Sequence, residues 1–496
     1  MKVMMRKYLP LLTALLLILS ACTSPLEVAR RTAQADRTPT ATPDLAAPAV
    51  TPQPGGSPTQ NPDQSVNGQP PCSGLAHSDS LPTVLWDNLR QQYRLLPVDP
   101  QNGYPLCGST PIPFEQYVHQ AVSPDGNMLA SFNYRDEYFQ NGSLSLVNLN
   151  SWQVVTTTVK VDAEINSMVF NPAGDLLAFA LHPKPGTQPS SQSPLFLYDV
   201  KSGQITDSTL LDFIPRSMHF TANGKWLAIY GSTQGGDTEQ LPAAYALLLW
   251  TNHLGLAWRQ ELNILDGSSL VGPKDQEKTL VTWSPGLVYS PQRDLLYIVS
   301  ANEEKFTIVD YINRSVEAKI IQPARSSWLD QLFAMTASPA QARAMWGLQK
   351  QAVLSADGGR LYVTGLASGT QPITGQPGQP EGPFGLQVID IKTTSQVAHL
   401  DTKAVDIQTS PDGKYLFLRS WDGGTPSTDV LLASTLEAVA HLPAQSLIAT
   451  HTFAGKVIIL AIQESLTESQ VSLLDSTKFN TLYTWTASGK PLWIKM

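Results

Sequence analysis

The chain has 496 residues with a formal charge of −8, and the charge becomes −11 once the three basic residues Lys2, Arg6 and Lys7 of an N-terminal signal are removed. An acidic protein of this kind is poorly suited to binding nucleic acid, so nucleic acid is not expected as a partner. Aromatic and β-branched residues are spread evenly, the chain has 33 Gly and 38 Pro, and no long amphipathic helix dominates. This composition favours an all-β fold.

The first residues have the features of an export signal. A positively charged start precedes the apolar stretch Leu9–Leu19, which is too short to span a bilayer as a mature helix. Leu19-Ser20-Ala21-Cys22 follows and resembles a bacterial lipobox, in which the signal is cut before the cysteine and the sulfur receives a diacylglyceryl group. The alternative is an ordinary signal peptide that happens to contain a cysteine.

The lipobox resemblance implies a signal peptide over residues 1–21 and lipid attachment at Cys22. A protein processed in this way is held outside the cytoplasm on the cell membrane, or on the outer membrane if the cell has one. Contact with the membrane would then be through the lipid anchor only. One acyl chain alone binds a membrane weakly, so several chains are needed for stable anchoring.

Residues 22–71 are rich in Thr, Pro, Ala, Gln, Gly and Ser, as in Thr38-Pro39-Thr40-Ala41-Thr42-Pro43. Such a segment has little apolar surface to offset the entropy of ordering, so it is predicted to be a disordered tether. As a flexible coil it would span roughly 35–45 Å. The domain that follows, residues 72–496, would therefore stand clear of the lipid headgroups.

Two further cysteines, Cys72 and Cys107, lie at the start of this domain. In an exported chain whose first cysteine is lipidated, one leftover pair indicates a single disulfide. Two free thiols are the alternative.

A turn of the type Ser-Pro-Asp-Gly recurs along the domain, each time between β-rich stretches. Pro presets φ, Asp bonds the backbone ahead of it, and Gly accepts a positive φ. Copies begin at Ser123, Asn171, Thr221, Ser290, Ser355, Ser410 and Thr452. The Gly-Lys pairs and the aspartates Asp125, Asp357 and Asp412 of these turns are interpreted as structural.

A second half-unit follows each turn: an apolar strand that usually ends in Asp, another turn and another strand. The aspartates of this half-unit include Asp199, Asp310, Asp390 and Asp475. Each unit thus has four short strands, and a repeat of this length without helical periodicity favours a propeller. The alternative for the aspartates, a calcium site, is less favoured than turn capping.

These repeats resemble those of bacterial β-propellers of the WD-repeat-like, YVTN and TolB kinds, over about residues 83–496. The resemblance implies a fold and is nearly silent on function, because propellers serve as enzymes and as scaffolds. The Trp-Asp signature of true WD repeats is absent at the expected positions.

Seven full units predict a seven-bladed β-propeller of four-stranded blades. The hairpin at 83–96 and the terminal strand Leu492-Trp493-Ile494 are additional, and one of them is expected to pair with the first or the last blade. The alternative is an eighth blade made from both termini. The segment between Asp475 and the last Gly-type turn is too short for two more strands, which argues against it.

No catalytic, metal-binding or phosphate-binding motif is found, so no catalytic residues, metal ligands or cofactor are predicted. The eight histidines show no ligand spacing. His119 and His219 precede repeat turns on the innermost strand of their units, where they would line the central channel or pack in the core.

Long insertions are predicted between the second and third strands of five units, at Asn133–Gly142, His182–Pro194, Gly231–Pro242, Leu366–Pro383 and Trp421–Ser427. Two more, at about 264–286 and 323–350, fall between units, and the second reads as two short helices ended by Gly347. Both kinds of connection emerge on one face of a propeller. Insertions gathered on one face often mark a binding face.

The predicted binding face combines aromatic and charged residues of these insertions, the mixture that dominates many interfaces. It consists of Tyr134, Arg135, Asp136, Tyr138, Trp328, Trp346, Trp421 and Asp422. Packing of these side chains onto the propeller is the alternative interpretation.

We therefore expect a monomeric binding or scaffold propeller, anchored outside the cytoplasm, that engages an unknown protein or polymer of the cell envelope or another extracellular ligand. The main alternative is a propeller-fold hydrolase or lyase with a site at the mouth of the central channel. A TolB-like assembly role is a third hypothesis, supported by repeat type alone.

Overall fold

The computed structural model describes the propeller domain in segments, all of which lie in the compact unit Ser65–Met496. The described residues are 72–76, 80–87, 92–102, 104–109, 112–114, 117–134, 142–161, 163–182, 192–233, 241–271, 279–322, 347–368, 371–372, 380–422, 425–443, 447–453, 456–463, 468–488 and 492–493. Cys22 and the predicted tether lie outside them. Every regular element in these segments is a β-strand, and no described helix could cross a bilayer.

Sheets of consecutive antiparallel strands make up the first half of the domain. Their strands are β4 (Tyr117–Val122), β5 (Met128–Tyr134), β6 (Gly142–Asn148) and β7 (Val154–Val161); β8 (Ile165–Phe170), β9 (Leu176–Leu181), β10 (Ser193–Asp199) and β11 (Gln204–Leu211); β12 (Ile214–Phe220), β13 (Trp226–Ser232), β14 (Ala244–Trp250) and β15 (Leu256–Leu262); and β18 (Gly286–Ser290), β19 (Leu295–Val299), β20 (Lys305–Asp310) and β21 (Ser315–Ile320).

The second half repeats the pattern. Its sheets are β22 (Gly347–Leu354), β23 (Arg360–Ser368), β26 (Leu386–Asp390) and β27 (Ser395–Leu400), with β25 (Pro380–Pro383) added beside β23; β28 (Ala404–Thr409), β29 (Tyr415–Asp422), β30 (Thr425–Leu432) and β31 (Ala438–Pro443); and β32 (Leu447–Phe453), β33 (Lys456–Gln463), β34 (Glu468–Leu474) and β35 (Thr481–Ser488). Each of these seven sheets corresponds to one predicted repeat.

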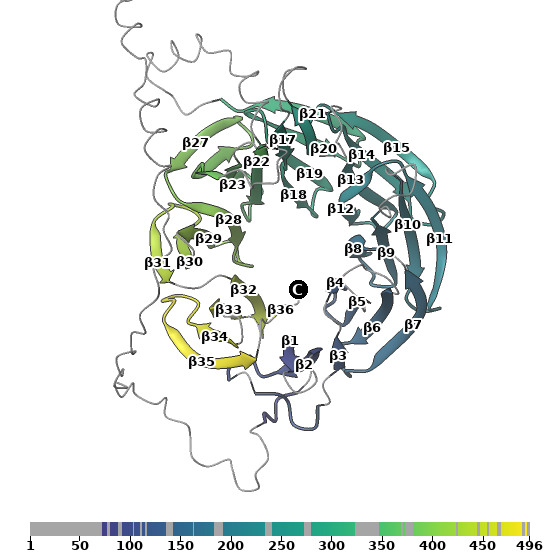
Figure 1. Ribbon diagram of the computed structural model, residues 1–496, viewed down its shortest axis with the longest axis vertical. Coiled ribbons are helices and arrows are strands. Elements are labelled where there is room, and N and C mark those ends of the chain that lie inside the picture. Colours follow the sequence, from purple (N-terminus) through teal and green to yellow (C-terminus); the bar gives the residue numbers. More distant parts are fainter. Residues whose placement is uncertain are drawn as a thin grey trace, which may run out of the picture. The chain divides into compact units, whose positions relative to one another are not determined.

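The sheets follow one another around a centre, with β4, β8, β12, β18, β22, β28 and β32 innermost (Figure 1). The second strands are buried almost throughout, as in β9 and β13, whereas outer strands such as β11 and β21 are largely exposed. Apolar clusters join each sheet to the next: Phe132 packs with Phe179, and Leu197 with Leu227. The fold is a β-propeller, as predicted.

The Ser-Pro-Asp-Gly turn forms the same hydrogen bonds in its copies. In the first copy the Ser123 hydroxyl donates to Asp125 Oδ1 over 2.5 Å and accepts from the Met128 amide. The Asn127 amide also donates to Asp125 Oδ1, and the bonds from Ser123 and Asn127 lower the pKa of Asp125. Equivalent bonds join Ser355 to Asp357 and Ser410 to Asp412. The turn aspartates therefore cap backbone, as predicted.

The aspartates of the second half-unit also cap turns. Asp199, Asp310, Asp390 and Asp475 each accept a backbone amide two or three residues ahead. The Thr477 hydroxyl and two amides lower the pKa of Asp475 to about 2. In each of these turns one residue has a positive φ, and it stands four positions after the Asp or after the residue that takes its place. Only one such residue is glycine, and the set is Trp152, Gly203, Leu254, Arg314, Thr394, Leu436 and Phe479.

A further four-stranded sheet combines both ends of the chain. It contains β3 (Ile112–Phe114), β2 (Gln92–Val98), β1 (Leu81–Asp87) and, from the C-terminus, β36 (Leu492–Trp493), in that order. The expected pairing of one terminal segment with a neighbouring repeat is therefore wrong, because β36 pairs with β1. The N-terminus supplies three strands, so a single C-terminal strand completes the sheet. This arrangement fits the eight-blade alternative better than seven blades.

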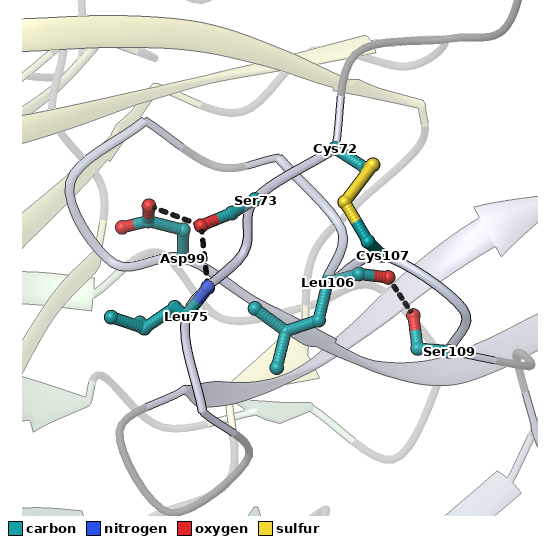
Figure 2. Close-up of a disulfide and its surroundings, with 7 residues drawn as sticks. All are labelled: Cys72, Ser73, Leu75, Asp99, Leu106, Cys107 and Ser109. Atoms are coloured by element: carbon teal, nitrogen blue, oxygen red, sulfur yellow. Dashed lines mark hydrogen bonds between the residues drawn. A yellow bond between two sulfur atoms is a disulfide. The ribbon is translucent and has the colours of Figure 1, made fainter.

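Cys72 and Cys107 form the predicted disulfide, with their Cα atoms 5.0 Å apart (Figure 2). Backbone bonds from Ser73 to Pro105 and from Cys107 to Ser73 hold the same two segments together. The Ser73 hydroxyl donates to Asp99, which is itself buried. The disulfide closes a loop with a sequence separation of 35, worth about 4 kcal/mol in the chain-entropy account. It ties the point where the predicted tether ends to the first sheet strands.

Two turn glycines allow the turn to be tested. Gly413 has φ +67° and Gly126 has φ +72°, but a Cβ on Gly413 would lie 2.3 Å from Cβ of Ala356 in the preceding sheet, whereas nothing lies within 4 Å of one on Gly126. Gly126→Ala should cost about 1 kcal/mol through backbone strain, and Gly413→Ala about 1–3 kcal/mol more through the clash. Urea unfolding measures both, and equal losses would contradict the contact between neighbouring turns.

Candidate binding site at the inserted sheet

The predicted binding face is only partly within the described residues. Tyr134 ends β5, and Trp421 and Asp422 end β29, each on the second strand of its sheet. Arg135, Asp136, Tyr138, Trp328 and Trp346 lie outside the described residues. The grouping of these eight residues into one surface therefore stays a prediction.

Two predicted insertions differ from the structure. Trp421–Ser427 was expected to be a long loop, but Trp421 pairs with Pro426 and Asp422 with Thr425, so the strands continue almost to the turn. Gly347 was expected to end a helix, but it begins β22, because it pairs with Ser368 of β23. The remaining part of that insertion, 323–346, lies outside the described residues.

Insertions from distant parts of the sequence meet in one extra sheet. β16 (Gly267–Val271) and β17 (Thr279–Trp283) form a hairpin between the β12–β15 and β18–β21 sheets. β24 (Gln371–Pro372), from the Leu366–Pro383 loop, pairs with β17. A between-repeat insertion and a within-repeat insertion therefore lie together. We call the three strands β16, β17 and β24 the inserted sheet.

Buried polar groups gather where the inserted sheet begins. Asp266 directly precedes β16, and only 2% of its side chain is exposed. Its Oδ1 forms an ion pair with Arg216 Nη2, 3.3 Å away. Its Oδ2 and the hydroxyl of fully buried Tyr230 make no hydrogen bond of regular geometry among the described residues, but the two side chains interact with each other. Burial raises the pKa of Asp266, and the guanidinium of Arg216 and the hydroxyl of Tyr230 oppose that rise.

Other buried polar atoms close to the inserted sheet also lack hydrogen-bond partners among the described residues. They are Trp283 Nε1 on β17, and Ser300 Oγ and Asn302 Oδ1 just after β19. Trp283 packs with Ala301 in one apolar cluster, which brings these groups close together. Buried polar atoms without partners are uncommon in folded proteins and call for a specific explanation at each site.

Bulges on the innermost strands position the exposed residues of this region. In β12 the register shifts between Pro215 and Ser217, so Arg216 is the extra residue. In β8 the shift lies between Ile165 and Ser167, so Asn166 is extra. The side-chain Nδ2 of Asn166 donates to the backbone carbonyl of Pro215, the residue before Arg216. Bulges commonly redirect a side chain, and here the Asn166 side chain reaches the backbone of the neighbouring bulge at Pro215.

The sequence interpretation did not identify Arg216, Asp266 or Asn166 as site residues. Arg216 and Asn166 each stand five positions before the first residue of a repeat turn, within mostly apolar inner strands. A polar residue at the same repeat position in two consecutive units was the available signal. Nothing in the sequence connected Asp266 to either of them.

His219 lies between two sheets. Its Nε2 is 2.8 Å from the Ser217 hydroxyl, and its ring stacks on Tyr289 of β18 with centroids 4.1 Å apart. The Tyr289 hydroxyl donates to Asp294, which also accepts the Ala222 amide. Burial lowers the pKa of His219 to about 4. The side chain of His119 is outside what the structure describes. Among the described residues no group of His, Cys, Asp and Glu could hold a metal ion.

Known proteins were compared with the chain at the level of sequence and of structure. No family model and no curated protein matches the sequence. Dihydro-heme d1 dehydrogenase NirN, solved in complex with DHE, is similar in structure with a TM-score of 0.53 and 12% identity, over 84% of this chain and 76% of that one. The Dos1 propeller (TM-score 0.43, 9% identity, 76% and 92% covered) and the Myceliophteria thermophila Cps50 (Swd1) β-propeller domain (0.36, 13%, 70% and 94%) are more distant. The likeness to NirN supports the fold alone.

His219 provides a test through pH. An unfolded histidine takes up a proton near pH 6.5, whereas His219 in the fold does so near 4. The unfolded state therefore binds more protons between these values, and stability falls by up to about 1.4 kcal/mol per pH unit as the pH drops through this window. His219→Phe, which keeps a ring against Tyr289, should lose this part of the pH dependence.

The measurement is urea unfolding of both proteins at several pH values from 7 to 4.5. Asp266, whose raised pKa acts with the opposite sign, is present in both proteins and cancels. Identical slopes for the wild type and His219→Phe would show that His219 titrates as it does in the unfolded chain.

Proposed function

We propose that this protein is a lipid-anchored propeller outside the cytoplasm that binds a protein or polymer of the cell envelope through its inserted sheet. The observation that carries the binding role is the pairing of β17 with β24, which unites insertions about 90 residues apart in the chain. A propeller needs neither insertion to form its blades. Insertions that assemble with each other, and not only with the blade beside them, have a role apart from the repeat.

The anchor is supported by the lipobox-like residues before Cys22 and by the disulfide, which suits an oxidising compartment. On this proposal residues 22–71 form a tether, and the disulfide at Cys72 marks its end. The protein acts as a monomer without a cofactor, and its only contact with the membrane is the acyl group. A TolB-like assembly role is one form of this function.

The anchor is tested by labelling cells with radioactive palmitate. The wild-type chain should be labelled and should run at the mature size, whereas Cys22→Ala should remain unlabelled and uncleaved, because the acylated thiol is missing. Cys72→Ser serves as the control, since it also replaces a cysteine, here one of the disulfide, but leaves the lipobox intact. Equal labelling of wild type and Cys22→Ala would rule out the lipoprotein.

The binding face is tested by photo-crosslinking in intact cells. A photoreactive residue at Gln371, in β24 of the inserted sheet, should capture a specific partner. The same residue at Lys225, in a repeat turn, is the control, because Lys225 is exposed and lies in a capping turn. Deleting residues 373–379 beside β24 should weaken capture by other positions of the face while the melting temperature stays nearly unchanged. Capture mainly at Lys225 would place the binding surface on the turn face instead.

One observation favours the alternative of a hydrolase. Ser217 and His219 are hydrogen-bonded on an innermost strand, as a nucleophile and its base would be. The lowered pKa of His219 and its stacked position make it a weak base at neutral pH. A fluorophosphonate probe would label Ser217 in an active hydrolase, and on the binding proposal Ser217 stays unlabelled.

A further inference from the structure

The ion pair between Arg216 and Asp266 is asymmetric. The Asp266 side chain is 2% exposed, whereas 43% of the Arg216 side chain is exposed on the innermost strand β12. Other arginine pairs of the domain differ: Arg259 with Asp212 is exposed on both sides, and Arg419 with Asp406 is partly exposed on both sides. Only the Arg216 pair, among the arginine pairs of the described residues, sets a buried carboxylate against an accessible guanidinium.

Burying a carboxylate carries a large desolvation penalty, which a single ion pair rarely offsets. Here, among the described residues, Asp266 Oδ2 makes no hydrogen bond of regular geometry, and besides Arg216 the carboxylate interacts with the buried hydroxyl of Tyr230. The ion pair also does not hold two blades together through buried contacts, because the Arg216 side chain is partly exposed to solvent. The ion pair therefore serves to fix the orientation of the Arg216 guanidinium.

Asp266 engages only one nitrogen of Arg216, Nη2, at 3.3 Å. A guanidinium has five N–H donors in a planar fork that matches the two oxygens of a carboxylate or phosphate group. No other bond of the Arg216 fork is formed within the described residues. Donors on an exposed, oriented guanidinium are therefore available to a ligand.

Asn166 adds a second polar group beside the backbone that carries Arg216. Its amide nitrogen donates to the carbonyl of Pro215, the residue before Arg216. Both Asn166 and Arg216 are extra residues of bulges in neighbouring innermost strands. The same bulge recurs in β28, where Val405 is the extra residue. The bulge therefore belongs to the repeat, and what distinguishes β8 and β12 is the polar side chain at this position.

We infer that Arg216 is the recognition residue of an anion-binding site on the inner rim of the propeller, oriented by Asp266 and flanked by Asn166. The ligand is a carboxylate or phosphate group carried by a larger molecule. This inference names the chemistry that the proposed binding propeller recognises and rests on that proposal for its biological role. The anion site itself does not require the lipid anchor or the inserted sheet to bind a macromolecule.

The test uses citrate and pyrophosphate as probes on the full chain, by calorimetric titration and by melting temperature at constant ionic strength. Both anions also stabilise proteins nonspecifically, in proportion to concentration. Wild type should show in addition a saturable response to at least one of them. Arg216→Gln should weaken that binding at least tenfold, and Arg216→Lys, which keeps the charge but loses the fork, should give an intermediate loss.

Arg259→Gln is the matched control, because Arg259 lies in the same sheet, is ion-paired and is 36% exposed. It should bind as wild type does. Asp266→Asn should weaken binding by misorienting Arg216, while its secondary structure by circular dichroism stays native. A response to citrate alone identifies a carboxylate ligand, and a response to pyrophosphate alone a phosphate ligand.

Equal responses of wild type, Arg216→Lys and Arg259→Gln to both anions would overturn the inference, even if Arg216→Gln failed to fold. The result of this anion-binding test is independent of the tests of the proposed function. Palmitate labelling and crosslinking at Gln371 can succeed while no anion binds, and an anion site can be found in a chain that is not anchored.

Discussion

The packing of one sheet against the next is the constraint on which this fold depends. A four-stranded sheet whose middle strands are apolar on both sides, such as β13, buries both faces only when a sheet lies on either side of it. Mixed clusters such as Leu197 with Leu227 and Leu460 with Val98 meet this need from sheet to sheet. The turns follow the same rule: glycines such as Gly413 lie against the turn of the preceding sheet, where a side chain would not fit.

Against this apolar background, the buried polar groups near the inserted sheet stand apart. Among the described residues, Trp283 and Ser300 have buried polar atoms without a hydrogen-bond partner, and the buried Asp266 and Tyr230 interact with each other where the inserted sheet begins. Local departures from complete hydrogen bonding are expected where function has been favoured over stability. The repeated blades provide a rigid frame, and the insertions and inner-strand bulges introduce the chemistry.

The structural similarity to NirN at only 12% identity agrees with this separation of a repeated frame from the insertions that carry the chemistry. Blades can be built from many sequences as long as turns and apolar strands recur, so a shared propeller carries little information about ligands. What distinguishes one propeller from another is the residues outside the repeat. In this chain those are the inserted sheet and the pair of Arg216 with Asp266.

The sequence by itself determined the features that depend on neighbouring residues: the turns capped by Asp125 and Asp199, the apolar strands around them and, through their repetition, the fold class. It also predicted the Cys72–Cys107 disulfide, because the lipobox resemblance assigns Cys22 to lipid attachment and leaves one pair. Tertiary structure alone decided the features that join distant residues. β36 completes the sheet of β1, β17 pairs with β24, and Asp266 reaches Arg216. The sequence also did not predict the positive φ of residues such as Leu436, because the turn imposes that conformation on residues other than glycine. Turns are encoded within a few residues, whereas these pairings depend on where the packed sheets bring separate segments together.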